Sequence, residues 1–387
     1  MILGADQDKD SLIVNWDDGT TSLFHYVWLR DNCLCTDCGN PMIGRKTLRL
    51  RDFPLNIRPA SLANDVDEVR INWDHDGHES TYSAAWLAAH AYEPERRQAR
   101  QFQPTLWDKT FLKAPPEINY GRIENSDSGL NELLLTVRQF GLCFVKDLPP
   151  EVGQMEKLAA RIGFIQENNF GLVQDLEIDP GKRSIANSFE ALRLHTDEPY
   201  RASPPGILLF HCLNTCAEGG GFSTFADGFK MAEVLRGEDP KGFEILTQVR
   251  QGFRRFFEGD VDVSADAPVI AVDEFGQVMG VRINDRVASP LSIAPDQVTV
   301  FYRAYKRLLE LAADPVFEIR RRLQPGDLAI FDNHRILHGR TALSLVGRRR
   351  LRWAQIELGD FHSRLRILAD QLGQPRDGLK ALRGAYG

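Results

Sequence analysis

The 387-residue chain lacks a long apolar run and an apolar leader. No stretch approaches the roughly 18 apolar residues that a membrane-spanning helix needs. The first ten residues, MILGADQDKD, have neither the basic n-region nor the apolar h-region of a secretory signal. The sequence therefore predicts a cytoplasmic protein without a membrane partner.

An excess of charge of one sign is also missing. The chain has 47 Lys and Arg against 54 Asp and Glu, a formal net charge of −7, and neither sign gathers in a long run. This pattern argues against a nucleic-acid partner. With 43% hydrophobic and 26% charged residues the composition is that of an ordered globular protein, and the length predicts two domains or one large one. No internal repeat is evident.

Cysteines are few, and their distribution argues against disulfide bonds. Of the six, Cys33, Cys35 and Cys38 crowd together, whereas the other three lie far away along the chain. The spacing C-x-C-x-x-C supplies three soft ligands from one loop, and a tetrahedral zinc site needs one more. The alternative is three buried, reduced thiols, which we disfavour because such crowding on a polar loop is unusual.

The chain divides into a small β-rich segment, a linker and a large second segment. Residues 1–92 contain short strand-like runs broken by Asp and Gly turns, including TSLFHYVW and STYSAAWL. Residues 93–115 are charged and interrupted by prolines, which indicates a surface linker. Residues 116–387 contain many strand-like runs and a few helices, of which FYRAYKRLLELAA is the clearest. Many strands without regular helix alternation predict a sandwich or barrel with helical insertions.

Three polar residues in the large segment have the character of a metal site. His195 and Asp197 project from one face of an extended strand, and His338 on a distant strand can supply a third ligand. Two imidazoles and one carboxylate leave three octahedral positions open, which suits non-heme Fe(II) oxygenases. H-x-D alone is common by chance. The basic run RRRLRWAQ after His338 strengthens the case, because a guanidinium can bind the distal carboxylate of a keto acid.

The ordered motifs of the chain resemble the γ-butyrobetaine hydroxylase branch of the 2-oxoglutarate-dependent oxygenases, which includes trimethyllysine dioxygenase. The motifs are WLRDNCLCTDC, LHTD, PPGILLFHCL, GGGFSTFADGF, FDNHRILHGR and SRLRIL, and they extend over nearly the whole chain. The resemblance implies a mainly β fold with flanking helices. Its catalytic core would be a double-stranded β-helix (jelly-roll) at 116–387, preceded by a small zinc-binding β domain at 1–92.

The same resemblance implies roles for the residues around the metal. His195, Asp197 and His338 would bind Fe(II), and Arg349 would hold the distal carboxylate of 2-oxoglutarate, with the hydroxyl of Ser223 beside it. Arg348 or Arg350 remains an alternative to Arg349, since the three arginines are adjacent. The alternation of side chains along a strand favours Arg349 only weakly.

The relatives also imply the fourth zinc ligand. In them a histidine eight residues before a Trp-Leu pair completes the site, and here that residue is His78, with His75 as a nearby alternative. A site with four protein ligands is closed and hence structural. We expect zinc to stabilise the small domain and to help pair two copies of the chain as a homodimer.

The expected substrate pocket departs from the family pattern. The butyrobetaine enzymes bind a trimethylammonium group in an aromatic cage by cation–π attraction. Here Phe170 keeps a ring, but three cage tyrosines are replaced by Asn187, Glu198 and Gln355. The cage is therefore mostly absent.

Other positions favour recognition of a zwitterion by charge. Glu198 would face an amine, Phe170 and Tyr200 would supply rings, and Arg286 would bind an anion such as a phosphonate or a second carboxylate. Ser184 occupies another polar position of the pocket. Each of these residues has the alternative of being a solvated surface residue.

Together these features predict an Fe(II)- and 2-oxoglutarate-dependent dioxygenase that uses O2 to hydroxylate an unactivated C–H bond of a small zwitterion. The substrate would carry a quaternary ammonium or an amine, as in 2-(trimethylamino)ethylphosphonate or a γ-butyrobetaine analogue. The alternatives are a carnitine-forming γ-butyrobetaine hydroxylase and a desaturating or cyclising oxygenase. A metal-binding interaction module without catalysis is a third alternative, which the complete ligand set argues against.

Overall fold

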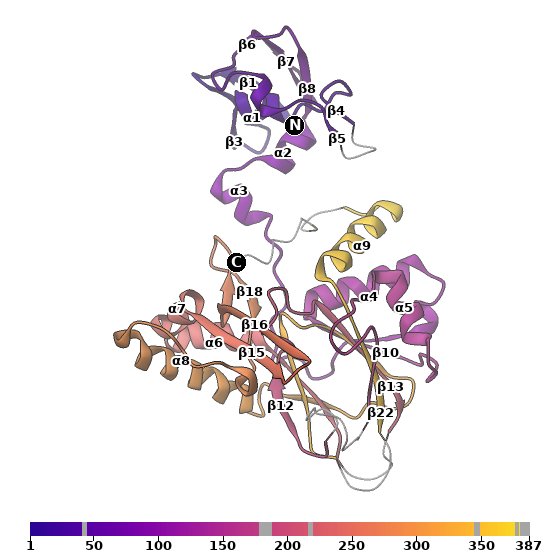
Figure 1. Cartoon of the computed structure of the whole chain (residues 1–387). Helices are drawn as coiled ribbons and strands as arrows, with labels where there is room; N and C mark the ends of the chain where they lie inside the picture. The colour runs from indigo at the N-terminus through magenta and orange to yellow at the C-terminus, as the bar shows by residue number, and fades with distance from the viewer. Residues whose placement is uncertain (41–44, 178–187, 216–219, 344–348, 376–378, 380–387) are drawn as a thin grey trace. The chain divides into compact units, whose positions relative to one another are not determined.

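The computed structural model describes residues 1–40, 45–177, 188–215, 220–343, 349–375 and 379 (Figure 1). The chain divides into two compact units, Met1–Gln101 and Phe102–Gly387, so the boundary falls inside the predicted linker 93–115. The first part of that segment forms helix α3 (Pro94–Ala99), and the second part packs into unit 2, where Trp107 is fully buried. The segment is therefore not a continuous surface linker.

Unit 1 consists of short antiparallel strands and short helices. Two three-stranded sheets have the orders β1-β2-β3 and β6-β7-β8, and β4 pairs with β5. The elements are β1 (Ile2–Gln7), β2 (Ser11–Trp16), β3 (Thr21–His25), α1 (Tyr26–Asp31), β4 (Gly39–Asn40), β5 (Arg45–Lys46), η2 (Leu50–Asp52), β6 (Pro59–Asn64), β7 (Glu68–Trp73), β8 (Glu79–Ser83) and α2 (Ala84–His90).

Unit 1 contains the same arrangement twice, although the sequence alone reveals no repeat. Each half has three antiparallel strands followed directly by a short helix, α1 or α2. In each half the indole N–H of a tryptophan donates to a serine hydroxyl, Trp16 to Ser22 at 3.0 Å and Trp73 to Ser80 at 2.8 Å. The repeat lies in packing and hydrogen bonding rather than in residue identity.

Two β-sheets form the centre of unit 2. One has six strands in the order β11-β22-β13-β20-β10-β9, and the other has four in the order β12-β21-β14-β19. All pairs are antiparallel except β9 with β10. The strands are β9 (Glu117–Asn119), β10 (Leu142–Lys146), β11 (Gln174–Leu176), β12 (Leu192–His195), β13 (Ile207–Asn214), β14 (Ser223–Asp227), β19 (Ile319–Arg321), β20 (Leu328–Asp332), β21 (Ile336–Arg340) and β22 (Arg350–Ile356).

Further elements surround or connect these sheets. Two hairpins, β15 with β16 and β17 with β18, lie in the chain between β14 and β19 of the four-stranded sheet. The elements are η3 (Tyr120–Arg122), α4 (Asp127–Phe140), α5 (Gln154–Ile162), α6 (Gly228–Glu238), α7 (Pro240–Gln248), β15 (Arg250–Phe257), β16 (Val261–Pro268), β17 (Ile270–Val272), β18 (Val278–Val281), η5 (Asp285–Val287), α8 (Pro295–Ala313) and α9 (Leu358–Gln371).

Aromatic side chains fill the space between the two sheets. Phe225 on β14 packs edge-on against Phe144 on β10 and Phe331 on β20, with ring centroids 5.5 Å apart in both pairs. Such edge-to-face contacts are a favourable geometry for buried rings. They join the two sheets face to face and support the strands that carry the polar site.

Helices cover the outer face of each sheet. Residues of α4, α5 and α9 form one apolar cluster with the six-stranded sheet, and residues of α6, α7 and α8 form another with β17, β18 and the four-stranded sheet (Figure 1). Unit 2 is therefore a layered, mainly β structure with flanking helices, as the sequence predicted.

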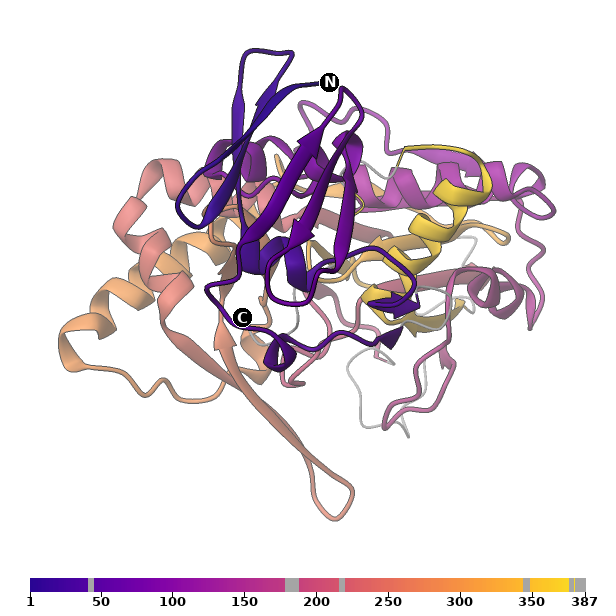
Figure 2. The same ribbon diagram turned by 90° about the horizontal axis from the view of Figure 1, so that it is seen from above.

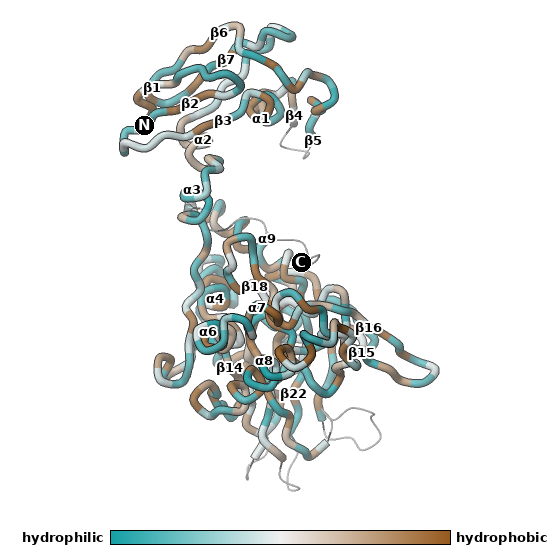
Figure 3. The backbone as a smooth tube through the Cα atoms, turned by 90° about the vertical axis from the view of Figure 1, so that its left-hand side faces the viewer, coloured by the Kyte–Doolittle hydropathy of each residue, from teal (hydrophilic) through white to brown (hydrophobic). Residues whose placement is uncertain are grey.

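Helix α8 shows how the hydrophobic pattern determines this layer. It begins at Pro295 and buries Phe301, Tyr305 and Leu308, which lie on one stripe of a helix. Teal and brown alternate along α8 in Figure 3, as expected of a helix with one buried face. The helix predicted at 301–313 is thus confirmed and begins at Pro295. None of the helices in the described part of the chain is long and apolar enough to cross a membrane.

Candidate active site and zinc site

His195, Asp197 and His338 lie together in unit 2, and we call them the His-Asp-His triad. One ligand atom from each residue lies within 4.8 Å of the other two. The Asp197 carboxylate is 3.3 Å from Nε2 of His195 and 3.4 Å from Nε2 of His338. The two histidines are register partners on the antiparallel strands β12 and β21, and Asp197 lies two residues after the end of β12. The sheet itself therefore brings distant residues into one site.

Neighbouring groups hold the triad in place. Nδ1 of His195 lies 2.8 Å from the carbonyl oxygen of Arg193, so this nitrogen is the N–H donor and Nε2 keeps its lone pair. The Asn333 side chain accepts from the Asp197 N–H at 2.8 Å and donates to the Asp197 carbonyl at 3.1 Å. Asn333 thereby fixes the backbone of the carboxylate residue.

The electrostatics of the triad favour an ionised carboxylate at Asp197. Burial acts to raise the pKa of Asp197, but its interactions with the imidazoles of His338 and His195 hold that pKa far below its ordinary value. Burial, followed by the charge of His338, lowers the pKa of His195. One negative oxygen and two imidazole nitrogens in this state are a donor set suited to Fe(II).

The triad opens into a cavity of about 780 Å³. Arg349 and Ser223 line it, and Nη2 of the buried arginine donates to the serine hydroxyl at 3.1 Å. This pair offers a guanidinium and a hydroxyl to an anion. These are the two residues to which the sequence resemblance assigned the distal carboxylate of 2-oxoglutarate.

Of the two alternatives to Arg349, the structure describes only Arg350. Arg350 directs its Nε to the carboxylates of Asp175 and Glu177, at 3.1 and 2.8 Å, and it does not line the cavity. Arg348 lies outside the described residues. A second buried arginine, Arg340, also lines the cavity, and burial together with the charge of Arg349 lowers its pKa to about 10.

Of the predicted substrate residues, Phe170, Glu198, Tyr200 and Arg286 line the same cavity. Gln355 is buried on β22 and does not line it, so a direct contact between this side chain and a substrate is not supported. Ser184 and Asn187 lie outside the described residues.

Glu198 is already paired with a cation of the chain itself. Its Oε2 accepts from Nε of Arg201, and its Oε1 accepts from Asn168 at 2.8 Å. Burial raises the pKa of Glu198, although the Arg201 hydrogen bond acts to lower it. Because its charge is compensated, Glu198 is a weaker counter-charge for a substrate amine than its position in the sequence suggested.

The backbone at Glu198 is unusual for a residue with a side chain. Its φ is +50°, in the left-handed region that favours glycine. Such a conformation beside Asp197 is held by the surrounding contacts, and backbone of this kind is concentrated at functional sites.

The cavity has lining residues that the sequence did not single out. Arg255 and Phe257 project into it from one face of β15, with the guanidinium carbon of Arg255 4.3 Å from the ring centroid of Phe257. Trp353 lines it from β22. In the sequence the run RQGFRRFF marks a strand with alternating faces. It contains no signal that this hairpin reaches a cavity formed by other strands.

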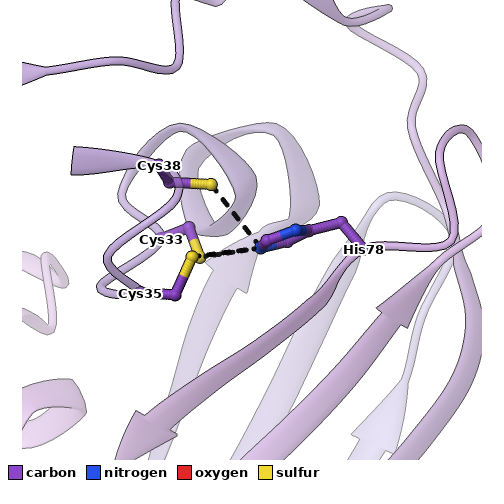
Figure 4. Close-up of side chains that lie close together, drawn as sticks. All are labelled: Cys33, Cys35, Cys38 and His78. Carbon is purple, nitrogen blue, oxygen red and sulfur yellow. Dashed lines mark hydrogen bonds between the residues drawn. The ribbon is translucent and has the colours of Figure 1, made fainter.

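In unit 1, three cysteines and His78 form a compact cluster (Figure 4). Nε2 of His78 lies 3.3, 3.4 and 3.5 Å from Sγ of Cys33, Cys35 and Cys38. Ligand separations of about 3.5 Å follow from tetrahedral zinc with Zn–S and Zn–N bonds of about 2.3 and 2.1 Å. The structure thus brings His78 rather than the exposed His75 to the cysteines. We call these four residues the cysteine cluster.

Two side chains outside the cysteine cluster stabilise its thiolates. Arg30 donates to Sγ of Cys38 at 3.2 Å and to Asp76 at 2.8 Å, and Ser80 donates to Sγ of Cys33 at 3.1 Å. Burial raises the pKa of Cys38 to about 12, although Arg30 acts to lower it. The thiolate therefore depends on compensating positive charge, which a bound Zn²⁺ supplies.

Comparison with known families assigns the chain to a class. Residues 98–355 match the family described as taurine catabolism dioxygenase TauD, TfdA family, and residues 3–88 match the gamma-butyrobetaine hydroxylase-like N-terminal family. The chain therefore belongs to the TauD/TfdA dioxygenase family, as its motifs predicted, and is an Fe(II)- and 2-oxoglutarate-dependent dioxygenase. The cofactors of this class are Fe(II), 2-oxoglutarate and O2.

Individual relatives cover almost the whole chain. A gamma-butyrobetaine dioxygenase from Pseudomonas sp. (strain AK-1) is 36% identical, with 92% of this chain and 93% of the relative covered. A trimethyllysine dioxygenase from Meyerozyma guilliermondii is 30% identical, with 95% and 96% covered. Among solved structures, the PvcB protein from Pseudomonas aeruginosa is 22% identical with a TM-score of 0.47, covering 66% of this chain and 90% of that one.

Proposed function

We propose that His195, Asp197 and His338 hold Fe(II), that Arg349 and Ser223 hold the distal carboxylate of 2-oxoglutarate, and that the enzyme hydroxylates a C–H bond of a small zwitterion. The observation that carries the proposal is the meeting of two imidazole Nε2 atoms and one carboxylate in a cavity that also contains the Arg349–Ser223 pair. Three ligands from one side leave room for a bidentate co-substrate.

Iron, when bound, supplies the activation of O2 that is coupled to the decarboxylation of 2-oxoglutarate to succinate. The chain's own residues position the reactants and exclude water. Asn333 holds Asp197, Arg193 fixes the tautomer of His195, and the Arg349–Ser223 pair orients the co-substrate. A target C–H bond is then selected by the wall of the cavity.

The fold and the second metal complete the proposal. The two face-to-face sheets of unit 2 are consistent with a double-stranded β-helix, which the sequence motifs imply. We assign structural Zn²⁺ to the cysteine cluster of unit 1, on the basis of its donor set and its separations. The cytoplasmic location and the homodimer stay predictions from the sequence.

The substrate is proposed to be a small zwitterion that carries a quaternary ammonium or an amine. Phe170 and Tyr200 offer ring faces, and Arg286 offers a guanidinium to an anion. 2-(Trimethylamino)ethylphosphonate and analogues of γ-butyrobetaine have this combination of charges.

γ-Butyrobetaine itself is the second candidate, because one relative over almost the whole chain is a gamma-butyrobetaine dioxygenase. The argument against it is that Glu198, which lines the cavity, stands where the family resemblance places a cage tyrosine. A trimethylammonium has no N–H to donate and depends on ring faces, so fewer rings weaken its binding.

The experiment is a turnover assay over a panel of zwitterions. The protein with Fe(II) and 2-oxoglutarate is assayed for succinate release and for the mass of each product. Gain of one oxygen supports hydroxylation, and loss of two hydrogens identifies a desaturating or cyclising enzyme. Preferred turnover of γ-butyrobetaine favours the second candidate, and no succinate under any condition would mean that the proposed catalytic function is wrong.

A further inference from the structure

Two arginines line the cavity of the His-Asp-His triad without a carboxylate partner. Arg255 projects from β15 and Arg286 lies in η5 at the exposed rim of the cavity. Among the residues that the structure describes, no acidic group forms an ion pair with either one. Nε of Arg255 is buried and has no hydrogen-bond partner, and Nε of Arg286 donates only to the side chain of Asn284, at 3.3 Å. A buried donor without an acceptor is costly, so this geometry favours an external acceptor.

Three of the carboxylates near these arginines are engaged elsewhere, and Asp260, which also lines the cavity, is exposed and forms no ion pair with Arg255 or Arg286 in the described part of the chain. Asp285, the neighbour of Arg286, pairs with Arg193 at 3.1 Å. Glu198 pairs with Arg201, and Asp197 lies between the two imidazoles of the triad. The two guanidiniums of Arg255 and Arg286 therefore keep their positive charge toward the cavity.

Arg255 is held in position by its own strand. Its guanidinium carbon stacks 4.3 Å from the ring centroid of Phe257, which projects from the same face of β15. The strand belongs to the long hairpin of β15 and β16, which runs out from the body of unit 2 in Figure 2. A guanidinium fixed by stacking loses little freedom when it binds an anion, which is the condition for a specific contact.

We propose that Arg255 and Arg286 together form a substrate-binding subsite for a doubly charged oxyanion, so that the enzyme prefers phosphonate over carboxylate zwitterions. The inference rests on the proposed function and goes beyond it by adding Arg255 and by naming the charge of the substrate's anionic group. One guanidinium suffices to bind a carboxylate, whereas a tetrahedral dianion has enough acceptor oxygens and charge to bind both guanidiniums. This subsite is separate from the Arg349–Ser223 pair, which serves the co-substrate.

The test uses two substrates that differ only in the anion. 2-(Trimethylammonio)ethylphosphonate and 3-(trimethylammonio)propionate have the same cation and the same two-carbon spacer. With the iron-loaded enzyme and 2-oxoglutarate, we expect the wild type to have a kcat/KM at least about 10-fold higher for the phosphonate. Arg255→Gln should lower that value by about 30-fold or more, lower the carboxylate value by less than about 5-fold, and leave the KM for 2-oxoglutarate unchanged.

Arg254→Gln is the matched control. Arg254 is the adjacent residue on β15, lies on the opposite face, is exposed and pairs with Asp262 at 2.7 Å. This variant removes the same charge from the same strand without touching the cavity, so all kinetic constants should stay at their wild-type values. Equal losses in Arg254→Gln and Arg255→Gln, or equal losses for both substrates in Arg255→Gln, would overturn the subsite.

A binding measurement separates the failure of the subsite from the failure of the proposed function. Methylphosphonate and acetate are titrated into the iron- and 2-oxoglutarate-loaded protein by calorimetry, which requires no turnover. We expect wild type and Arg254→Gln to bind methylphosphonate at least about 10-fold more tightly than Arg255→Gln and Arg286→Gln do, and to prefer it over acetate. Equal binding in all four proteins contradicts the subsite even when succinate is released. Absent succinate with intact, Arg255-dependent binding contradicts only the proposed catalytic function.

Discussion

At the scale of single residues, Asp197 tests the proposed iron site most directly. It is the one carboxylate of the triad, 3.3 and 3.4 Å from the two imidazoles. Asp197→Ala should lower 2-oxoglutarate turnover at least about 100-fold. Two imidazoles alone would bind Fe(II) weakly and would leave a different set of coordination positions open on the metal. Succinate release and iron content measured by elemental analysis check this expectation.

The internal control for this variant is the metal of the other unit. Zinc content should not change, because the cysteine cluster lies in unit 1 and Asp197 in unit 2. Undiminished succinate production by Asp197→Ala would remove Asp197 from the iron site.

Arg349 and Arg350 offer a second test, since adjacent residues of the same type have different surroundings. Arg349→Ala should raise the KM for 2-oxoglutarate by about 30-fold or more, which corresponds to about 2 kcal/mol for a truncated buried charge contact. Arg350→Ala is the matched control and should leave that KM unchanged, because Arg350 pairs with Asp175 and Glu177 away from the cavity. Steady-state kinetics with 2-oxoglutarate as the varied component measure this difference. A larger effect in Arg350→Ala would mean that Arg350, and not Arg349, binds 2-oxoglutarate.

These residues also indicate how far the sequence can predict the site. The spacing of H-x-D and the distant His338 suffice to expect a shared site, because strand geometry fixes which side chains face the same way. The sequence did not decide which of the three adjacent arginines binds 2-oxoglutarate, because the answer depends on what packs beside β22. Arg255 was not predicted at all, because only the packing of the hairpin shows that its side chain meets the cavity.

At the scale of elements, the pairing of β12 with β21 sets the separation of the two histidines. Gly339 lies between His338 and Arg340, and a Cβ at this position would come within 3.0 Å of the Leu192 carbonyl oxygen and the Thr224 hydroxyl. Gly339→Ala should therefore push the strands apart, weaken Fe(II) binding by about 10-fold or more and lower the unfolding temperature. Iron titration followed by activity, together with thermal unfolding, checks both effects.

Gly280→Ala is the control for Gly339→Ala. Gly280 lies in β18, and a Cβ there would meet its nearest neighbours at 3.8 and 3.9 Å, an ordinary van der Waals contact. This variant should keep the wild-type affinity for Fe(II). The same affinity in Gly339→Ala would mean that the strands tolerate the extra methyl and that their spacing does not control the site.

The limits of the sequence at this scale appear in unit 1. The runs TSLFHYVW and STYSAAWL were expected as strands, but each turns into a helix, at Tyr26 and Ala84. Aromatic and β-branched residues favour strands locally, yet the helices bury Leu29 and Leu87 completely in the core of the unit. Tertiary packing thus decides where each strand ends. It also explains why the repeated arrangement of unit 1 is visible in the structure and not in the residue identities.

At the scale of the whole molecule, the chain has two proposed metal sites of different kinds in two units. The cysteine cluster has four protein ligands and is closed, whereas the triad has three and opens into a cavity. Unit 1 spans Met1–Gln101, and a closed structural metal site adds its binding free energy to the stability of the folded unit that contains it. The two sites should therefore fail in different ways when their metals are removed.

Cys35→Ser makes this difference measurable. It should remove about one zinc per chain and lower the unfolding temperature of unit 1 by about 5 °C or more, while succinate release by the remaining folded protein changes little. Cys143→Ala is the control: Cys143 is buried in unit 2 and is not a member of the cysteine cluster, so this variant should keep its zinc. Zinc is measured by elemental analysis and unfolding by calorimetry. Full zinc content in Cys35→Ser would show that the cluster is not a metal site, and equal zinc loss in both variants would show that the loss reflects general unfolding.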